Sequence, residues 1–105
     1  MIARVWKARA TPARARDYDA YFARTVQPEL DALAGFERAT ILHERRGDAV
    51  EIAVITWWSS LDAIRSFAGD SLTTAVVHDE AAALLIDFDG RVTHHDVTYD
   101  RAAAR

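Results

Sequence analysis

The chain has 105 residues, which is enough for one domain with a single modest core. Its formal net charge is -3 at pH 7, and its 13 basic side chains are scattered among 16 acidic ones, so it lacks the clustered positive charge of a nucleic-acid surface. The absence of cysteine excludes a disulfide, a thiolate zinc site, an iron–sulfur cluster and a cysteine nucleophile. It also fits a reducing compartment, and we predict a cytoplasmic protein without a nucleic-acid partner.

Residues 2–10 alternate between two faces, as a strand does, and one of these faces carries Ile2, Arg4, Trp6 and Ala8. The segment has no continuous apolar core after a basic stretch, which an export signal requires. No later run approaches the length needed to span a bilayer. We therefore expect a protein that is neither exported nor bound to a membrane.

A first helix is predicted to begin after Thr11. Thr11 is suited to cap it, and Pro12 is suited to its first position, where the missing N–H is not needed. Apolar side chains then recur every three or four residues, as on a helix that packs one face against a sheet: Tyr18, Tyr21, Phe22, Val26, Leu30 and Leu33. Pro28 is expected to kink or restart the helix, and Gly35 is expected to end it.

Two strands, 36–45 and 49–58, are predicted to form a hairpin around a tight turn at residues 46–48. The second strand is apolar on both faces, with Val50, Ile52, Val54 and Trp58 on one and Ala53, Ile55 and Trp57 on the other. Helices on one side of a small antiparallel sheet cover only one of these faces. The simplest cover for the other face is a second copy of the chain, so we predict a homodimer.

A second helix is predicted to start in the sequence SSLD at 59–62, where a hydroxyl precedes a carboxylate by three residues. Its inner face is expected to carry Leu61, Ile64, Phe67 and Ala68. Gly69 ends it, and residues 70–79 are predicted to form an irregular or briefly helical connection to another apolar stretch, 80–86. Residues 89–90 are expected to turn the chain into a last strand over 91–99.

The order strand, helix, strand, strand, helix, strand is the split β-α-β pattern of ferredoxin-like folds. This is an α+β class with helices on one side of a four-stranded antiparallel sheet. We expect the single domain to cover residues 1–100. Residues 101–105 have nothing large to bury and are expected to form a frayed tail. Two such sheets that face each other form a dimeric α+β barrel.

Four segments carry a resemblance to a known family: the strand end TWW, the following SSLDAIRSFAGD, the later AVVHDEAAALL and the closing RVTHHDV. With these segments the chain resembles the antibiotic biosynthesis monooxygenase superfamily over nearly its whole length. The resemblance implies a homodimeric barrel with a pocket in each subunit, between the sheet and the helices. Some relatives oxidise aromatic polyketides with dioxygen and without a metal or flavin, and others bind and degrade haem.

The resemblance also implies particular site residues. Trp58 matches the strand-end Trp that borders the substrate pocket in the oxygenases, and a core role in anchoring the helix to the sheet is the alternative. Phe67 falls near a Trp of the haem-degrading relatives, and His78 falls near their axial histidine. Those relatives carry a pocket Asn on the first strand, whereas this chain has no Asn. The smaller ring at Phe67 and the missing Asn favour oxygenation over haem degradation.

Histidine is the natural proton carrier near neutral pH, and the chain contains four. His43 is expected at a solvated strand edge. His94 and His95 are adjacent on a strand and point to opposite faces, which argues against a metal site formed by the pair. His94 is predicted to line the pocket or the dimer interface, with a hydrogen-bonded buried role as the alternative. His78 lies in an irregular segment at the pocket mouth and is the first candidate for a catalytic base.

The first helix carries an aromatic stripe that includes Tyr18, Tyr21 and Phe22. Such a stripe either packs as core or lines an apolar cavity for a planar ligand. Arg4 and Arg38 are expected on inner strand faces, where an unpaired guanidinium is unfavourable. We expect ion pairs across the dimer interface for both.

From this pattern we hypothesise a cofactor-independent monooxygenase that acts on a small planar aromatic or enol substrate with dioxygen. The expected catalytic residues are His78 and His94. The expected substrate-binding residues are Tyr18, Phe22, Trp58 and Phe67. Neither a metal nor an organic cofactor is expected. The alternative is a homodimer without catalytic activity that binds haem, with His78 as axial ligand, or a hydrophobic metabolite.

Overall fold

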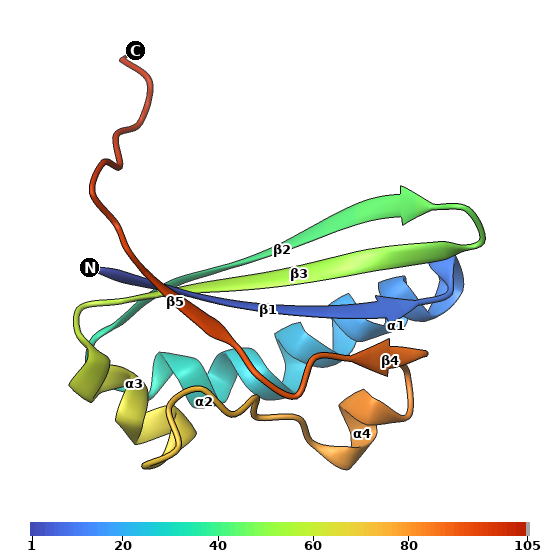
Figure 1. Cartoon of the computed structure of the whole chain (residues 1–105), viewed down its shortest axis with the longest axis horizontal. Coiled ribbons are helices and arrows are strands. Elements are labelled where there is room, and N and C mark those ends of the chain that lie inside the picture. The colour runs from blue at the N-terminus through green and yellow to red at the C-terminus, as the bar shows by residue number, and fades with distance from the viewer. Residues whose placement is uncertain (105) are drawn as a thin grey trace.

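The strands and the helices form two layers. The computed structural model describes residues 1–104, and its strands form one antiparallel sheet in the order β2-β3-β1-β4, with β5 also paired to β1. The strands are β1 (Ile2–Ala10), β2 (Phe36–Arg46), β3 (Ala49–Trp58), β4 (Asp87–Phe88) and β5 (Thr93–Asp96). The helices lie on one face of this sheet (Figure 1): α1 (Pro12–Tyr21), the π-helix η1 (Phe22–Val26), α2 (Gln27–Asp31), α3 (Leu61–Ala68) and α4 (Asp79–Ala82). This is the predicted α+β, ferredoxin-like arrangement, with a sheet that does not close on itself.

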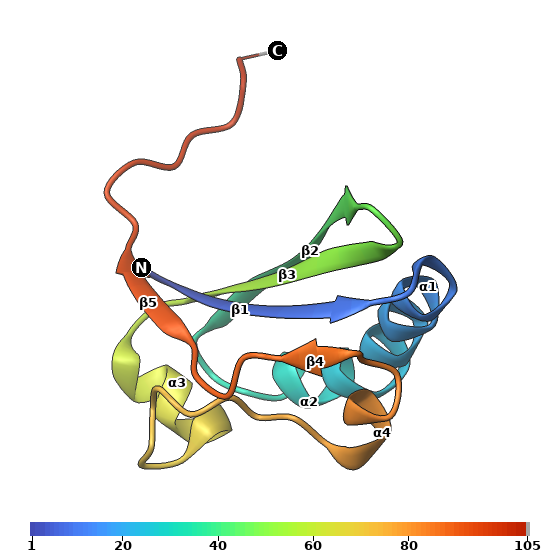
Figure 2. The ribbon, with the colours of Figure 1, turned by 45° about the vertical axis from the view of Figure 1, so that its right-hand side comes forward.

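Alternation along β1 and β3 divides their side chains between the two faces of the sheet. The strands are antiparallel, with Ile2 opposite Trp58 and Trp6 opposite Val54. The helix-side residues of β3 are all buried, namely Val50, Ile52, Val54, Thr56 and Trp58, and the alternate residues are half-buried. The inner face therefore forms the core with the helices, whereas the outer face carries no helix (Figure 2).

The first helical run is continuous but contains a wider turn. The Thr11 side chain caps it by accepting the Arg14 N–H at 3.3 Å, and Pro12 follows in the first turn. The disturbance predicted at Pro28 takes the form of η1, the π-helical turn that precedes it. Pro28 has no N–H to donate, and its ring excludes the carbonyl of Arg24, so the turn widens. Neither this run nor any other helix within residues 1–104 is long and apolar enough to span a membrane.

Helix α3 begins within the predicted SSLD segment, but its cap is Ser60, one residue after the Ser59 that the spacing to Asp62 indicated, and the Ser60 hydroxyl accepts the Ala63 N–H at 3.1 Å. Ile64 is fully buried and Phe67 is half-buried on the inner face. The prediction that Leu61 also faces inward is wrong, since this side chain is 44% exposed. The helix starts at Leu61, and its packed stripe begins one turn later, at Ile64.

The last predicted strand, 91–99, is shorter and interrupted in the structure. Only β5 falls within it, whereas β4 precedes the turn that was expected at residues 89–90. Both strands pair antiparallel with the free edge of β1, so the chain does not reverse direction at this point and the turn prediction is wrong. Between β4 and β5 the backbone pairs with the connecting segment 72–78. The Ala75 N–H donates to Gly90 O at 2.9 Å, and the Val92 N–H donates a second hydrogen bond, of 2.8 Å, to the same segment. A backbone N–H that donates to the connecting segment cannot also donate to β1, so the strand is interrupted at this point. The same bonds hold the segment 72–78 over the inner face.

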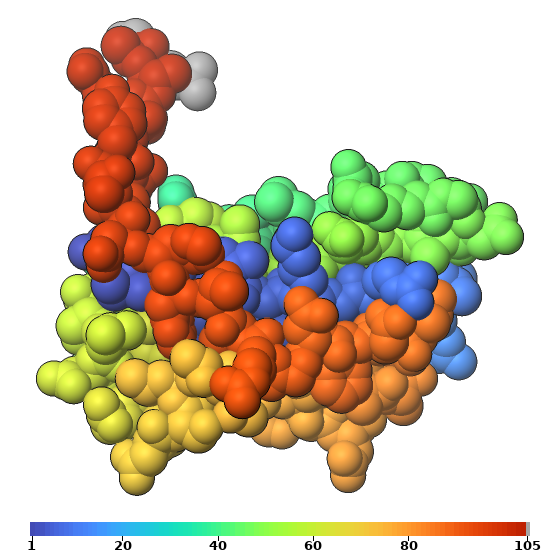
Figure 3. All heavy atoms as spheres, viewed as in Figure 1, coloured from blue at the N-terminus to red at the C-terminus, as the bar shows by residue number. Residues whose placement is uncertain are grey.

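After Asp96 the chain leaves the body as an extended arm. The Val97 N–H donates to Met1 O at 3.0 Å. Beyond this bond the arm projects on the side of the sheet opposite to the helices (Figures 1 and 3), and Asp100 Oδ1 on the arm lies 3.9 Å from Arg38 Nη2. Within the predicted frayed tail, 101–105, Arg105 lies outside the described residues.

Candidate functional site

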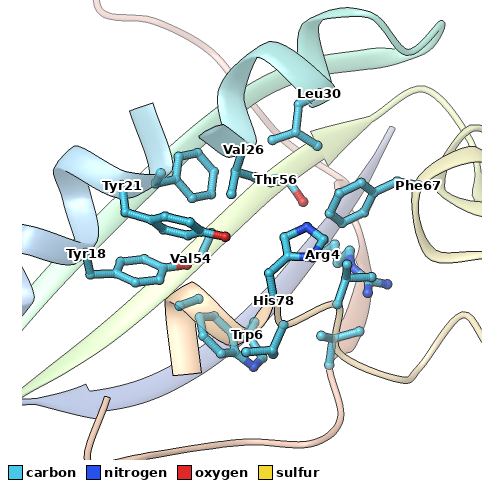
Figure 4. A pocket seen from close by; sticks show the side chains of 15 residues that line it. Arg4, Trp6, Tyr18, Tyr21, Val26, Leu30, Val54, Thr56, Phe67 and His78 are labelled. Carbon is cyan, nitrogen blue, oxygen red and sulfur yellow. The ribbon is translucent and has the colours of Figure 1, made fainter. Parts of the chain in front are cut away.

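A cavity lies between the inner face of the sheet and the helices (Figure 4). Its walls come from β1 and β3, from the first helical run, from the end of α3 and from residues 76–78. Its volume is about 60 Å³, well below the roughly 300–1,000 Å³ of sites that enclose drug-sized ligands. In this closed form the cavity admits a small ligand, and a ligand of several fused rings requires wall residues to move.

Most of the cavity wall is aromatic or aliphatic. The Tyr18 ring lies in the middle of the aromatic part, with ring centroids 6.0 Å from Trp6, 5.9 Å from Tyr21 and 6.3 Å from Phe22. Phe67 contributes from α3 on the other side (Figure 4). Burial raises the pKa of the Tyr18 hydroxyl, so this group is protonated at neutral pH. Such a surface fits a flat apolar ring that needs few polar contacts.

Arg4 reaches the cavity from β1 and is only 5% exposed. Its Nη1 donates to Leu72 O at 2.6 Å and lies 3.0 Å from His94 Nε2, and its Nη2 donates to Thr74 O at 3.1 Å. Because every guanidinium nitrogen is a donor, His94 Nε2 must be the acceptor, and the imidazole carries its proton on Nδ1. Burial lowers the pKa of Arg4 to about 10, which leaves the group charged at neutral pH. Arg4 thus joins β1 to β5 and to the connecting segment 72–78.

Two hydroxyl groups also contribute to the cavity wall. Thr56 Oγ1 accepts the indole N–H of Trp58 at 2.8 Å. The Tyr21 hydroxyl is buried and has no hydrogen-bond partner within residues 1–104. Burial, with Glu80 and Glu29 nearby, raises the pKa of Tyr21, so its hydroxyl is a protonated donor. An unpaired buried donor is rare in native proteins and calls for an explanation.

His78 lies at the mouth of the cavity, immediately before α4. Its side chain is half-exposed, and its ring projects between Tyr21 and Phe67 in Figure 4. Its Nε2 lies 3.7 Å from Glu29 Oε2, which is beyond a hydrogen bond but within the range of an electrostatic contact. The His78 side chain forms no cap on α4. A proton acceptor with an adjacent carboxylate therefore faces an apolar cavity.

No family model matches this sequence, and no curated protein matches it significantly. Solved structures match over almost the whole chain. A proposed antibiotic biosynthesis monooxygenase from Bacillus cereus has a TM-score of 0.68 and 17% identity over 97% of each chain. The haem degrader MhuD from Mycobacterium tuberculosis has a TM-score of 0.63 and 17% identity over 97% of this chain and 100% of that one. SnoaB, a cofactor-independent oxygenase from Streptomyces nogalater, has a TM-score of 0.62 and 24% identity over 94% of each chain.

This chain has the antibiotic biosynthesis monooxygenase fold. The fold of the single subunit that the sequence resemblance implied is therefore confirmed. The identities lie below the level at which the reaction follows from the likeness, because one fold hosts several chemistries. The activity must be argued from the residues of the site.

Four of the six predicted site residues line the cavity of this fold: Tyr18, Phe22, Phe67 and His78. The other two, Trp58 and His94, lie behind its wall. Trp58 is fully buried, and its ring centroid lies 5.3 Å from that of Phe36, edge-on, and 5.9 Å from that of Phe67. It supports Phe67 by packing and Thr56 by its indole hydrogen bond. Trp58 therefore has the core role that was the alternative to a place in the pocket wall.

His94 lies behind Arg4 instead of facing the cavity. The lone pair of its Nε2 is directed at the guanidinium. Burial lowers the pKa of His94, and the charges of Arg4 and His95 lower it further. A neutral imidazole whose acceptor nitrogen is already occupied is placed to orient Arg4 and not to take a proton from a ligand.

Among the cavity residues that were not selected as site residues from the sequence, the aromatic and polar ones are Arg4, Trp6, Tyr21 and Thr56. The alternation of residues 2–10 was a usable signal, since it placed Arg4 and Trp6 on the inner face. The expected partner of Arg4 was an acidic side chain across a dimer interface. Its observed partners are two carbonyls and one imidazole of its own chain.

Arg38 was expected on the inner face, and this prediction is wrong. The register of β2 shifts by a β-bulge between Phe36 and Arg38, which reverses the alternation and pairs Arg38 with Trp57 on the outer face. Its guanidinium lies 4.3 Å from the centroid of the Trp57 ring, and its Nη2 lies 3.9 Å from Asp100 Oδ1. The guanidinium is thus stacked and ion-paired at the surface.

The state of His94 predicts how folding stability depends on pH. Its folded pKa is below the ordinary value of 6.5, so protonation favours the unfolded chain. The contribution of His94 to stability is full above about pH 6.5 and is lost as the pH falls toward the folded pKa. We expect Tm to fall between pH 7.5 and 5.5 more steeply in wild type than in His94→Gln, whose amide oxygen still accepts from Arg4. Parallel thermal melts for the two proteins would contradict this assignment.

Proposed function

We propose that this protein is a cofactor-independent oxygenase that acts on a small planar aromatic or enol substrate with dioxygen. The observation that supports it is an aromatic cavity with a histidine–carboxylate pair, His78 and Glu29, at its mouth. The fold is shared with SnoaB, which is described as a cofactor-independent oxygenase. The aromatic residues Tyr18, Phe22 and Phe67 hold the planar substrate, and Trp58 supports Phe67 from the core.

In this proposal the His78 imidazole takes a proton from an acidic C–H or O–H group of the substrate. Glu29 stabilises the imidazolium that forms. The substrate anion then reduces dioxygen, the two recombine as a peroxide, and loss of water leaves a carbonyl. For a methylene substrate the balance is one CH₂ group and one O₂ giving one C=O group and one H₂O. The protein supplies a base, orientation and exclusion of water, and His94 contributes by positioning Arg4.

Oxygen uptake tests this function. We expect the protein to accelerate uptake above the buffer rate with anthrone, which becomes anthraquinone and water, or with the smaller 1,4-dihydroxynaphthalene. Label from isotopic dioxygen should enter the new carbonyl of anthraquinone. Rates equal to those in buffer for both compounds would exclude the oxygenase and leave ligand binding without chemistry as the function.

Haem is a poor fit to this cavity. MhuD, a haem degrader, shares the fold, and His78 is placed where it can meet a ligand. However, a volume of about 60 Å³ is far smaller than a porphyrin. The neighbouring wall residues Trp6, Tyr18 and Phe22 pack against one another and leave no slot for a flat ring of that size. We therefore derive no step through haem, and a haem titration without a Soret shift is the expected result.

We also propose that two copies pair through the outer face of the sheet. This face has no helix on it, and its centre is apolar: Ala3, Val5, Leu42, Ala53, Ile55 and Trp57. Leu42 is 50% exposed in the single chain. Charged groups at the rim are paired within the chain, as in Lys7–Glu51 at 3.7 Å and the contact of Arg9 with Asp87. Two such faces are self-complementary and close into a barrel.

The Ile55→Lys substitution tests the dimer. Wild type is expected to sediment as a dimer at micromolar concentration. A lysine at the apolar centre of the outer face would be buried without a partner, so we expect the dimer dissociation constant to rise by roughly 100-fold or more. Leu61→Lys makes the same chemical change on α3 and is expected to leave the dimer intact. A wild-type monomer under these conditions would refute the pairing.

A further inference from the structure

The cavity contains a buried positive charge that no acidic side chain neutralises. Arg4 is 5% exposed, and within residues 1–104 its polar partners are Leu72 O, Thr74 O and His94 Nε2. None of these groups carries a negative charge, because His94 accepts as a neutral imidazole. Carbonyl dipoles orient a guanidinium but do not neutralise it. Burial of such a charge is unfavourable unless a counter-ion is supplied.

The bonding of Arg4 also leaves donors free. A guanidinium has five N–H donors in a planar fork. Three contacts are made to the protein, two by Nη1 and one by Nη2. The remaining donors belong to a side chain that lines the cavity. A carboxylate is the group that best matches such a fork in both shape and charge.

A second unpaired donor lines the same cavity. The Tyr21 hydroxyl is buried, its residue is 2% exposed, and it has no partner within the described chain. It comes from α1, on the opposite side of the cavity from Arg4 in Figure 4. A donor in this position needs an oxygen acceptor, and the aromatic wall between the two groups is apolar. The cavity therefore offers one cationic end, one neutral donor and a flat space between them.

We propose that the cavity binds a small aromatic acid, with its carboxylate on Arg4 and a second oxygen accepting from the Tyr21 hydroxyl. This rests on the proposed function, because it names the class of substrate that the same site takes. The carboxylate supplies the counter-ion that Arg4 lacks. The ring lies against Tyr18 and Phe67, with its reactive position toward His78.

Calorimetric titration with 4-hydroxybenzoate and its neutral analogue 4-hydroxybenzamide tests the proposal. The two probes have the same ring and hydroxyl and differ in charge. We expect wild type to bind the acid at least about tenfold more tightly, the size of effect of a hydrogen bond to a charged group. Arg4→Met should reduce this preference to within about twofold, and Arg4→Lys should retain part of it. Equal affinities in wild type, or an undiminished preference in Arg4→Met, would overturn the proposal.

Tyr21→Phe keeps the ring and its packing, so it tests the other end of the cavity even where Arg4 variants do not fold. We expect it to bind 4-hydroxybenzoate several-fold more weakly and benzoate with unchanged affinity. An equal effect on both ligands would overturn the role of the Tyr21 hydroxyl. These titrations need no turnover. A preference for the acid without oxygen uptake refutes the oxygenase alone, and oxygen uptake without the preference refutes the acid subsite alone.

Discussion

The His78→Ala variant is expected to oxidise its substrate about 10²–10⁴-fold more slowly than wild type, the range that a positioned general base contributes. His78 is the only histidine that lines the cavity within residues 1–104. Its Nε2 lies 3.7 Å from Glu29 Oε2. The loss should appear in kcat, because the aromatic wall that binds the substrate remains. Oxygen uptake at saturating substrate measures it.

His43→Ala is the matched control for His78→Ala. His43 also pairs with a carboxylate, since its Nε2 lies 3.0 Å from Asp19 Oδ1, but it lies outside the cavity. Its removal should leave kcat within about twofold of wild type. Glu29→Gln should lower kcat less than His78→Ala, because the imidazole remains and only the charge beside it is lost. A kcat of His78→Ala close to that of His43→Ala would remove His78 as the base.

The Trp58→Ala variant is expected to lose about 3–5 kcal/mol of the free energy of unfolding, as large aromatic truncations in cores do. Trp58 is fully buried between Phe36 and Phe67. Its loss removes these ring contacts, leaves a void and deprives Thr56 Oγ1 of its donor. Since a domain of this size has a total stability of roughly 5–15 kcal/mol, the variant should be close to unfolding at 37 °C.

Urea unfolding followed by circular dichroism measures the effect of Trp58→Ala. Trp58→Phe retains a ring and is expected to lose less than Trp58→Ala. Leu61→Ala, on the adjacent helix but 44% exposed, should change stability by less than about 1 kcal/mol. A loss below 1 kcal/mol for Trp58→Ala would show that this side chain is not part of the core that supports the cavity.

Local patterns were sufficient to predict most of the fold. Alternation in residues 2–10 and 49–58, the cap at Thr11 and the turn at residues 46–48 each depend on neighbours in sequence, and each appears in the structure. The wider turn before Pro28 also has a local cause. Features that depend on pairing between distant segments were missed. The break in the last strand arises because its backbone bonds the connecting segment, which carries no periodic pattern of its own.

The candidate site could be predicted only in part, for the same reason. The aromatic stripe of the first helix, the position of His78 and the family resemblance at Phe67 led to four lining residues. The pairing of Arg4 with His94 joins residues 90 positions apart, so no short-range pattern indicates it. The bulge that moves Arg38 to the outer face is likewise invisible without the register of β2 and β3. The unpaired Tyr21 hydroxyl becomes evident only when all its neighbours are in place.

The segment that closes the cavity, residues 72–78, is joined to the last part of the chain by backbone bonds at Ala75 and Val92, and to β1 by the Arg4 side chain. It is not a strand of the main sheet, so a change in its length leaves the register of β1 and β3 intact. Insertions in residues 72–78 can therefore enlarge or reshape the cavity during evolution. Homologous proteins with longer versions of this segment should accept bulkier substrates on an unaltered scaffold.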